Sequence, residues 1–368
     1  MGRRVTVLAP DRISARTPQY GSATIRALAT ATPSVRRTQD ELTRELADLW
    51  GLRGAALARW RRIARGTGIR SRAAVLPVGQ TPRLTTGQRM RLYESHAPSL
   101  AAAPARAALR CAGVEPGRVT DLIVVTCTGF SAPGVDLALA DRLGLAPTVR
   151  RQVIGFMGCF GAITGLRAAA GVCAAEPTAV TLVVCAELCS LHLRQADDAA
   201  NLVASALFSD GAAAVVVTGA CWSGAGPDHA SAGVAGLAID GLGRSVVAPG
   251  TAGAMSWRIT DAGFAMTLSE DVPAILGESM RELVGTDRAG ALAVHPGGPA
   301  ILDAVERAVG HGRDLDDARG VLRDHGNMSS PSVLFVLERL AARQRVDRAT
   351  LAAFGPGLSL ETISLCRR

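Results

Sequence analysis

Two kinds of hydrophobic segment alternate along this chain. Short runs of almost only apolar residues, at 121–127 and 179–185, have the length and composition of strands buried on both faces of a sheet. Segments such as 136–143 and 201–207 instead place apolar residues three or four positions apart, which predicts helices. Strands that alternate with helices indicate a layered α/β fold in which most strands are parallel.

The first part of the chain is less regular. Residues 5–8 and 23–28 have the composition of strands. A threonine and a glutamate at the two ends of Thr38-Gln-Asp-Glu41 can cap each other's amides, so we predict that a helical region begins there and continues to residue 65. Residues 72–90 are predicted to be a loop, and a long alanine-rich helix is expected over residues 97–111.

Residues 151–157 predict a strand that ends in a sharp turn at Gly158 and Cys159, and a helical pattern starts at Ala162. A cysteine in this position lies at the first turn of a helix, where unpaired N–H groups and a partial positive charge favour the nucleophilic thiolate. Most unpaired cysteines are small buried hydrophobes, and this interpretation is open for Cys159 too. The glycines on either side of the turn favour a nucleophile.

The second half of the chain repeats this pattern of strand, glycine-rich turn and helix. A predicted strand leads into His295-Pro-Gly-Gly298, and a helix follows. A glycine- and serine-rich stretch at 219–236 separates the repeats, so we predict two similar α/β halves, residues 1–220 and 235–368. Turns from two such halves can meet at a pseudo-twofold axis, which would bring the cysteine and the histidine into one site.

A third turn of this kind contains Asn327, within Gly326-Asn-Met-Ser-Ser330, and precedes an apolar helical segment. Asn327 alone would be interpreted as a helix cap, and the other five histidines as surface or core residues. Together, however, the three turns supply a thiol that can carry an acyl group and two N–H donors that can stabilise an enolate oxygen. The sequence therefore predicts an acyl-transfer site at Cys159, His295 and Asn327.

Composition narrows the possible ligands. All 40 basic residues are arginine, which excludes lysine chemistry, and the net charge of +8 suits phosphorylated ligands. The arginines are mixed with acidic residues, so a nucleic-acid groove is not indicated. The eight cysteines show no paired CxxC spacing, so we predict reduced thiols and no metal site. We also predict a cytoplasmic protein, because neither a signal peptide nor a membrane-spanning run is evident.

Five motifs point to a family. They are Gly158-Cys-Phe160, Ala206-Leu-Phe-Ser-Asp-Gly-Ala-Ala213, His295-Pro-Gly-Gly-Pro299, Gly326-Asn-Met-Ser-Ser330 and Phe354-Gly-Pro-Gly357. With them, nearly the whole chain resembles bacterial members of the type III polyketide synthases, the chalcone and stilbene synthase family of thiolase-fold condensing enzymes. The resemblance implies two duplicated halves in an α-β-α-β-α layered fold. It also implies a homodimer that uses malonyl-CoA and an acyl-CoA starter, with no other cofactor and no metal.

The resemblance implies residue roles as well. Cys159 matches the acyl-carrying nucleophile, and His295 and Asn327 match the pair that binds the malonyl thioester, promotes its decarboxylation and stabilises the enolate. Phe208 matches a phenylalanine that gates the passage between a coenzyme A tunnel and the reaction cavity. Such an enzyme loads an acyl-CoA on the cysteine, extends it by decarboxylative Claisen condensation, and releases a pyrone, resorcinol or related phenol.

Other family positions bind coenzyme A or shape the cavity. Arg59 and Arg62 fall where the family has cationic residues for the coenzyme A phosphates, but the third such position is Gly66. Ala300 falls where a backbone amide meets the pantetheine arm. Two further positions are expected at the cavity wall, Ser329 and Pro356.

Five cavity positions differ from those of the plant enzymes. Met266 stands where a second gating phenylalanine is found, and Ala132 where a methionine crosses into the neighbouring subunit. The positions of cavity-lining threonines are occupied by Cys127, Cys189 and His192. Most of these changes enlarge the cavity or make it more apolar, while the histidine fills it, so we hypothesise an aliphatic acyl-CoA starter.

Two other interpretations stay open. A single-round ketosynthase similar to β-ketoacyl synthase III, or an acyltransferase of the same fold, would share the cysteine, histidine and asparagine. The Gly-Asn-Met-Ser-Ser motif and Phe208 favour a polyketide synthase over both. A catalytically silent scaffold would have no physical need for all three residues.

Overall fold

The computed structural model describes residues 23–367 apart from 81–82, 196–197, 225–232, 285–289 and 311–314. The strand predicted at 5–8 and part of the stretch at 219–236 lie outside these residues. The described strands are β1 (Thr24–Ala31), β2 (Val35–Thr38), β3 (Ser71–Ala74), β4 (Asp121–Thr126), β5 (Arg150–Gly155), β6 (Val180–Leu188), β7 (Asp210–Thr218), β8 (Leu237–Val247), β9 (Met255–Thr260), β10 (Gly263–Leu268), β11 (Ala291–Val294), β12 (Arg348–Gly355) and β13 (Ser359–Arg367). The described α-helices are α1 (Gln39–Leu49), α2 (Gly54–Gly66), α3 (Thr86–Ala112), α4 (Val135–Leu143), α5 (Gly161–Ala175), α6 (Ala199–Leu207), α7 (Val272–Val284), α8 (Pro299–Val309), α9 (Asp316–His325) and α10 (Ser332–Arg343).

The main sheet has nine strands and consists of two parts. Its strand order is β11-β12-β13-β8-β1-β7-β6-β4-β5. β1 and β8 pair over only two residues each, at Thr24 and Ile25 of β1, so β1-β7-β6-β4-β5 and β11-β12-β13-β8 meet at one corner. β4 runs parallel to β5 and β6, and β11 parallel to β12. The other five neighbouring pairs in this sheet are antiparallel, so the prediction that most strands are parallel is wrong. An apolar run shows that a strand is buried on both faces but does not specify the direction of its neighbours.

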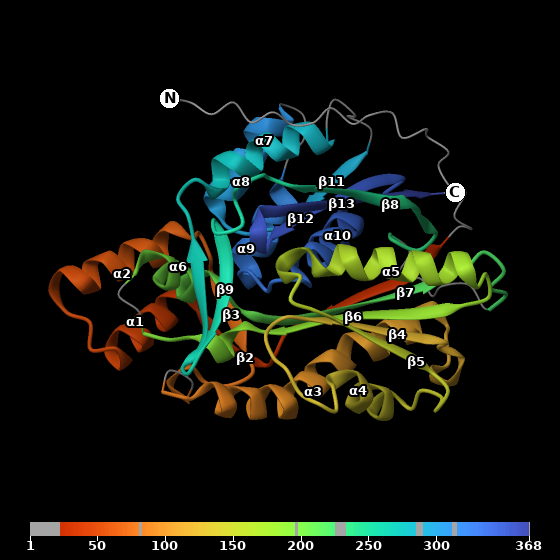
Figure 1. Ribbon diagram of the computed structural model, residues 1–368, viewed down its shortest axis with the longest axis horizontal. Helices are drawn as coiled ribbons and strands as arrows, with labels where there is room; N and C mark the ends of the chain where they lie inside the picture. Colours follow the sequence, from red (N-terminus) through yellow and green to blue (C-terminus); the bar gives the residue numbers. More distant parts are fainter. Residues whose placement is uncertain are drawn as a thin grey trace.

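Helices separate and cover the two parts of the sheet (Figure 1). α3 and α4 pack on the outer face of the part that contains β4 and β6, and α7 and α8 lie outside the other part. α5 and α10 lie between the two parts. The result is an α-β-α-β-α arrangement, which confirms the predicted thiolase-like α/β fold. The division into halves at 1–220 and 235–368 remains a prediction.

α5 is the central helix of the core. The segment Gly158–Ala175 has a mean hydropathy of 1.4 over 18 residues, so by length and composition alone it could cross a membrane, which the sequence analysis overlooked. In the protein, however, 56% of this segment is buried, and α5 contacts β4 and β6 on one side and β8 and β13 on the other. Gly165 permits this close packing, because a β-carbon there would lie 2.9 Å from both Val125 and Val183.

Two regions near the N-terminus differ from the prediction. The capping box of Thr38 and Glu41 begins α1 as expected, but the helical region is interrupted by a turn in which Gly51 has a φ of +63°. Residues 72–90 are not a continuous loop, because they contain most of β3 and the first turn of α3. A second capping box, formed by Thr85 and Gln88, starts α3 eleven residues before the expected position and is the signal that the sequence analysis missed.

Candidate active site

The predicted nucleophile lies at the junction of β5 and α5. The chain passes Gly158 with a φ of +71°, forms one 3-10 turn, Gly158–Phe160, and enters α5. A β-carbon on Gly158 would lie 2.3 Å from Cδ of Pro356, so only glycine fits this turn. The turn holds Cys159 two residues before Gly161, the first residue of α5, so it lies at the mouth of the helix as predicted.

His295 follows β11 in the second half of the molecule. Its backbone N–H donates to the carbonyl oxygen of Ala352 over 2.8 Å, which continues the pairing of β11 with β12. The imidazole is 1% exposed and packs edge-on against Phe354, with ring centroids 5.3 Å apart. Gly297 also faces the Phe354 ring, and a β-carbon on Gly297 would lie 2.7 Å from Cε2 of Phe354.

Asn327 is fixed by both its backbone and its side chain. Its N–H donates to the Leu207 carbonyl and its own carbonyl accepts from Ser209 N–H, both over 2.9 Å. These two bonds tie the turn before α10 to the chain around Phe208. The side-chain Oδ1 accepts from Ser329 N–H over 2.8 Å, so Nδ2 is the donor end. One N–H of Nδ2 donates to the Gly297 carbonyl over 3.3 Å, and its second N–H has no partner among the described residues.

One cavity of about 390 Å³ brings these residues together. It is lined by Cys159, Val203, Ala204, Leu207, Phe208, Met255, Met266, Leu268, His295, Gly297, Ile301, Asn327 and Phe354. The three turns predicted to meet therefore do meet, together with both gate positions. The remaining lining residues are almost all apolar, and the sequence analysis did not identify them because they come from elements far apart in the chain.

The imidazole of His295 has no hydrogen-bond partner on either nitrogen within the described structure. Burial lowers the pKa of His295 to about 3, so the ring is neutral at physiological pH. A buried polar group without a partner costs free energy, and such groups in native proteins commonly mark functional positions. Here the unpaired nitrogens belong to a residue that lines the cavity of Cys159 and Asn327.

The Cys159 thiol is held in its neutral form. Burial raises its pKa to about 12, the nearby charge of Glu187 acts in the same direction, and a hydrogen bond to Oγ of Ser329, over 3.5 Å, opposes both. The lowered thiol pKa expected from the helix terminus is therefore absent from this structure. The physical reason is that the thiol is desolvated and lies near the charge of Glu187, while His295 is uncharged.

A second cavity, of about 550 Å³, shares Ala204 and Phe208 with the first. It is lined by Cys127, Thr128, Cys189, His192, Leu193, Arg194, Asn201, Ala204, Ser205, Phe208, Trp257, Phe264 and Ser329. Four of the residues expected at the reaction cavity are among them, namely Cys127, Cys189, His192 and Ser329. Because Phe208 lines both cavities, its ring occupies the position expected for a gate between them.

Arg72 fixes the backbone of this gate and was not identified from the sequence. Its Nη1 donates to the carbonyls of Ser205 and Phe208 over 2.8 and 2.7 Å, and its Nε donates to Oε1 of Gln39 over 3.0 Å. Burial lowers the pKa of Arg72 to about 10, so the guanidinium stays charged at neutral pH. Trp257 lies beside the Phe208 ring, with centroids 5.6 Å apart.

Met266, at the second gate position, is attached to α6 through its backbone. Its N–H donates to Oδ1 of Asn201 over 3.0 Å, and its carbonyl accepts from Nδ2 of the same side chain over 3.1 Å. The asparagine thus forms a two-bond clamp between α6 and β10. Met266 itself is 8% exposed and faces the cavity of Cys159.

His192 occupies part of the second cavity in a fixed orientation. Its Nδ1 accepts from Phe264 N–H over 3.2 Å, so its Nε2 carries the proton and donates to the Thr128 carbonyl over 2.7 Å. The ring also stacks on Phe264, with centroids 4.0 Å apart. Burial lowers the pKa of His192 to about 4. This histidine is therefore neutral and fully hydrogen-bonded, and it reduces the volume of the cavity, as expected.

Glu187 is a second buried residue that the sequence analysis missed. It is 0% exposed and accepts hydrogen bonds from Cys127 N–H, from the Thr128 hydroxyl over 2.8 Å and from the Ser330 hydroxyl over 2.5 Å. Burial raises the pKa of this carboxyl group. The available signal was a single charged residue at the end of the apolar β6. Its contacts join the end of β4 to the turn that carries Asn327.

Several predicted site residues lie outside both cavities. Arg59 and Arg62 are exposed on α2, and Ala300 is exposed in the first turn of α8, next to Ile301 of the cavity lining. Pro356 does not line either cavity but packs against Gly158. Ala132 is exposed on the loop before α4 and does not reach either cavity of its own chain. No group of three or more potential metal ligands occurs within the described residues.

The chain matches known proteins over nearly its whole length. Residues 11–221 match the family model of chalcone and stilbene synthases, N-terminal domain, and residues 243–367 match the C-terminal domain. A 1,3,6,8-tetrahydroxynaphthalene synthase of Streptomyces peucetius subsp. caesius is 35% identical over 382 residues, which cover 99% of this chain and 96% of the relative.

Solved structures agree with these sequence matches. PKS-I of the brown alga Ectocarpus siliculosus superposes with a TM-score of 0.86 at 28% identity, covering 95% of this chain and 99% of the alga's. The C-terminal type III polyketide synthase domain of Steely1, a type I/III hybrid from Dictyostelium, gives 0.84 at 26% identity, with coverages of 94% and 99%. The chain therefore belongs to the chalcone and stilbene synthase family and is a type III polyketide synthase, a condensing enzyme that transfers acyl groups.

Proposed function

We propose that Cys159 carries the acyl group in this enzyme and that His295 and Asn327 bind the thioester carbonyl of malonyl-CoA. The observation that supports this assignment best is the buried imidazole of His295, whose two nitrogens have no partner in the described structure. A thioester oxygen placed between its N–H and Nδ2 of Asn327 would satisfy both donors, and the cavity they share with Cys159 would hold the two reacting carbons together.

The proposed reaction has three steps. Cys159 loses its proton and attacks the starter thioester, so that a new carbon–sulfur bond forms and coenzyme A leaves. Malonyl-CoA then loses CO₂, and the electron pair of the broken carbon–carbon bond becomes an enolate whose oxygen accepts hydrogen bonds from His295 and Asn327. The enolate carbon attacks the acyl group on Cys159 and releases the thiolate. Coenzyme A thioesters supply both the acyl group and the enolate carbon, and we propose that no other cofactor takes part.

Ionising Cys159 requires a change from the structure described above, in which the thiol and the imidazole are both neutral. We propose that they ionise as a pair, because an imidazolium beside a thiolate offsets the desolvation that disfavours each charge alone. His295 is the basic residue that shares the cavity with the thiol. Ser329, which bonds Cys159 in the resting state, would then lose its role as the hydrogen-bond partner.

Replacement of the nucleophile tests this assignment. We expect Cys159→Ala to abolish polyketide formation but to retain decarboxylation of malonyl-CoA to acetyl-CoA, because the two enolate donors remain. Products and acetyl-CoA are quantified by mass spectrometry, with Cys173→Ala as the control for loss of a buried cysteine of α5. Normal polyketide formation by Cys159→Ala would show that another residue carries the acyl group.

Two starters are supported by different observations. The apolar sulfur groups of Cys127 and Cys189 in the second cavity support an aliphatic acyl-CoA. The similarity to a tetrahydroxynaphthalene synthase instead supports malonyl-CoA as the source of every unit and a polyhydroxylated aromatic product. Incubation with malonyl-CoA alone distinguishes the two, because only the second predicts an aromatic product without an added starter.

We also propose a cytoplasmic homodimer whose interface includes β5. This strand lies at the edge of the sheet and pairs with β4 alone. Large apolar side chains are exposed on it and directly after it, with Val153, Phe156 and Met157 exposed by 47%, 68% and 37%. An unpaired strand edge with apolar side chains is an association surface. The loop that contains Ala132 follows β4, the parallel neighbour of β5, and thus lies at the same end.

A further inference from the structure

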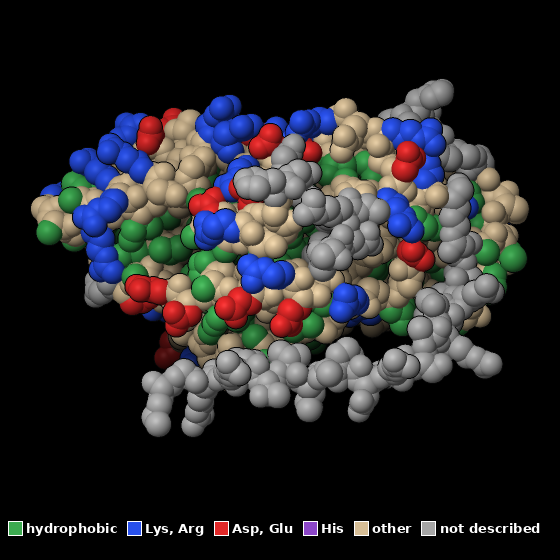
Figure 2. Space-filling view, turned by 90° about the horizontal axis from the view of Figure 1, so that it is seen from above, with side chains coloured by type: hydrophobic (Ala, Val, Ile, Leu, Met, Phe, Trp, Pro, Cys, Tyr) green, Lys and Arg blue, Asp and Glu red, His purple; other side chains and the backbone are tan. Residues whose placement is uncertain are grey.

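A cleft of about 1650 Å³, open to solvent, lies between α1, α2, the start of β3 and the end of α9. Arginines from all four segments line it, namely Arg44, Arg61, Arg65, Arg70 and Arg323. Figure 2 shows basic side chains gathered at the end of the molecule where Figure 1 draws α1 and α2. Asp40 is the single carboxylate among the lining residues that the structure describes.

This cleft lies on a different flank of α2 from the expected coenzyme A positions. Arg61 and Arg65 are four residues apart and form one row, whereas Arg59 and Arg62 form another. With 3.6 residues per turn, the two rows are roughly 110° apart around the helix axis. Neither Arg59 nor Arg62 lines the cleft, and the cleft shares no lining residue with the cavity of Cys159.

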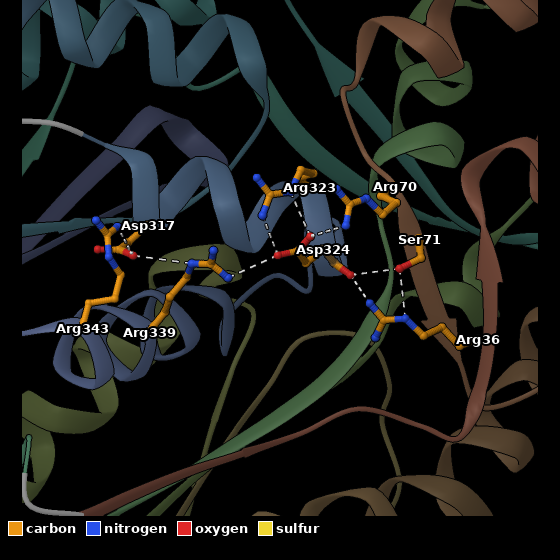
Figure 3. A network of polar contacts seen from close by, with 8 residues as sticks. All are labelled: Arg36, Arg70, Ser71, Asp317, Arg323, Asp324, Arg339 and Arg343. Atoms are coloured by element: carbon orange, nitrogen blue, oxygen red, sulfur yellow. Dashed lines mark hydrogen bonds and ion pairs between the residues drawn. The ribbon is translucent and has the colours of Figure 1, made fainter.

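The acidic groups near the cleft are too few for its arginines. Asp324 is the carboxylate partner of Arg323 at 2.9 Å and of Arg70 at 4.0 Å, and it is also bonded by a third arginine, Arg339, at 3.2 Å (Figure 3). One carboxylate is thus divided among three guanidinium groups. The backbone carbonyl of the same aspartate accepts from Ser71 and from Arg36 (Figure 3).

The arginines of the helices have even fewer partners. Arg44 donates to a backbone carbonyl, that of Asp40, over 3.3 Å, and its charge also acts on the Glu41 carboxylate. The guanidinium groups of Arg61 and Arg65 have no hydrogen bond or ion pair to any residue that the structure describes. The arginines of the cleft outnumber the carboxylates beside them, and a bound polyanion would balance this excess of positive charge.

The floor of the cleft is ordered and concave. It is formed by buried residues, among them Gln39, Thr43, Ala64 and Ile69, which are between 2% and 9% exposed. A floor of this kind, rimmed by planar donors, suits a compact ligand that accepts paired N–H···O bonds, as phosphate groups do. We propose that this cleft binds a phosphorylated small molecule with adjacent phosphate groups, at a site separate from the coenzyme A passage.

The test compares two charge-matched double variants of the full-length enzyme. Arg61→Gln/Arg65→Gln removes two charges from the cleft, and Arg59→Gln/Arg62→Gln removes two charges from the other flank of the same helix. Binding of inorganic pyrophosphate is measured by calorimetry at constant ionic strength, and KM for malonyl-CoA is measured in parallel. Loss of two charge-assisted contacts should weaken pyrophosphate binding about tenfold or more in the cleft variant alone.

The same experiment can overturn the proposal. We expect the cleft variant to keep the wild-type KM for malonyl-CoA, because that ligand uses the other flank. If wild-type enzyme does not bind pyrophosphate at millimolar concentration, or if the cleft variant binds it as tightly as wild type, the cleft is not a phosphate site. If the control variant loses pyrophosphate binding to the same extent, the anion occupies the coenzyme A passage instead.

Discussion

Burial determines the charge state of the single residues in this active site. Cys159 and His295 are both desolvated, so the thiol keeps its proton and the imidazole stays uncharged. His192 is neutral for the same reason but differs in one respect, since both of its nitrogens are hydrogen-bonded. His192 thus stabilises the cavity wall, whereas both ring nitrogens of His295 are available to the thioester that we propose as its ligand.

These buried histidines predict how stability depends on pH. The pKa of His295 in the folded protein, about 3, lies below the usual value of about 6.5, so between these values the unfolded chain binds a proton that the folded chain does not. Above pH 6.5 both states leave this ring uncharged, and His295 does not lower the free energy of unfolding. As the pH falls from 6.5 towards 3, protonation of the unfolded chain lowers the free energy of unfolding. At pH 5 the loss is about 2 kcal/mol.

The corresponding experiment is urea unfolding of wild type and His295→Asn at pH 7.5 and pH 5. Carboxylates titrate in both proteins and cancel in the difference. We expect the variant to lose about 2 kcal/mol less stability than wild type between the two pH values. Equal losses in the two proteins would mean that His295 is protonated in the folded state at pH 5.

At the scale of elements, the turns were predictable and the long-range contacts were not. The strand, turn and helix around Cys159 and His295 follow from local patterns, because a glycine-rich turn and an apolar run lie within a few residues of each other. Arg72 and Glu187 gave no comparable signal, since Arg72 bonds Phe208, 136 residues away, and Glu187 bonds Ser330, 143 residues away. Partners so distant depend on the topology of the sheet, which the local sequence does not specify.

The clamp between α6 and β10 gives a prediction at this scale. Asn201→Leu removes both bonds to the backbone of Met266 and leaves two polar groups unpaired, which should cost about 1–3 kcal/mol for each buried group. Because Met266 lines the cavity, we also expect a changed distribution of product chain lengths. Thermal unfolding and product analysis by mass spectrometry measure the two effects.

Asp198→Ala provides the control for this prediction. Asp198 caps α6 by accepting from Asn201 N–H over 2.9 Å, and it also accepts from Nδ2 of the same residue over 2.9 Å. The two bonds between Asn201 and Met266 do not involve Asp198 and remain when it is replaced. Its replacement should cost about 1 kcal/mol and leave the product distribution as in wild type. The clamp has no influence on the cavity if Asn201→Leu lowers stability without altering the products, or if both variants alter them equally.

At the scale of the whole molecule, the sheet edge at β5 predicts the oligomeric state. We expect wild type to be a dimer and Val153→Arg to weaken it, because a charge would be buried in an apolar interface. Val247→Arg places the same charge on β8, at a residue that is 58% exposed, and should remain dimeric. Light scattering after size-exclusion chromatography measures the masses. A monomeric wild type, or dissociation of both variants, would argue against this interface.

The proposed dimer also bears on starter choice, since Ala132 is exposed in its own chain and lines neither cavity there. The family position holds a methionine that enters the neighbouring subunit, so Ala132→Met should fill space next to the second cavity. If the starter is aliphatic, kcat/KM for hexanoyl- to dodecanoyl-CoA should exceed that for p-coumaroyl-CoA, and Ala132→Met should lower it most for the longest chains.

His192→Thr should have the opposite effect. It removes the ring that is stacked on Phe264 and thereby enlarges the same cavity from within one chain. Long starters should gain in kcat/KM relative to hexanoyl-CoA, although the loss of two hydrogen bonds lowers stability. A preference of wild type for p-coumaroyl-CoA would contradict the aliphatic starter. Aromatic product from malonyl-CoA alone, unaffected by either substitution, would show that the cavity accommodates the growing chain and does not select a starter.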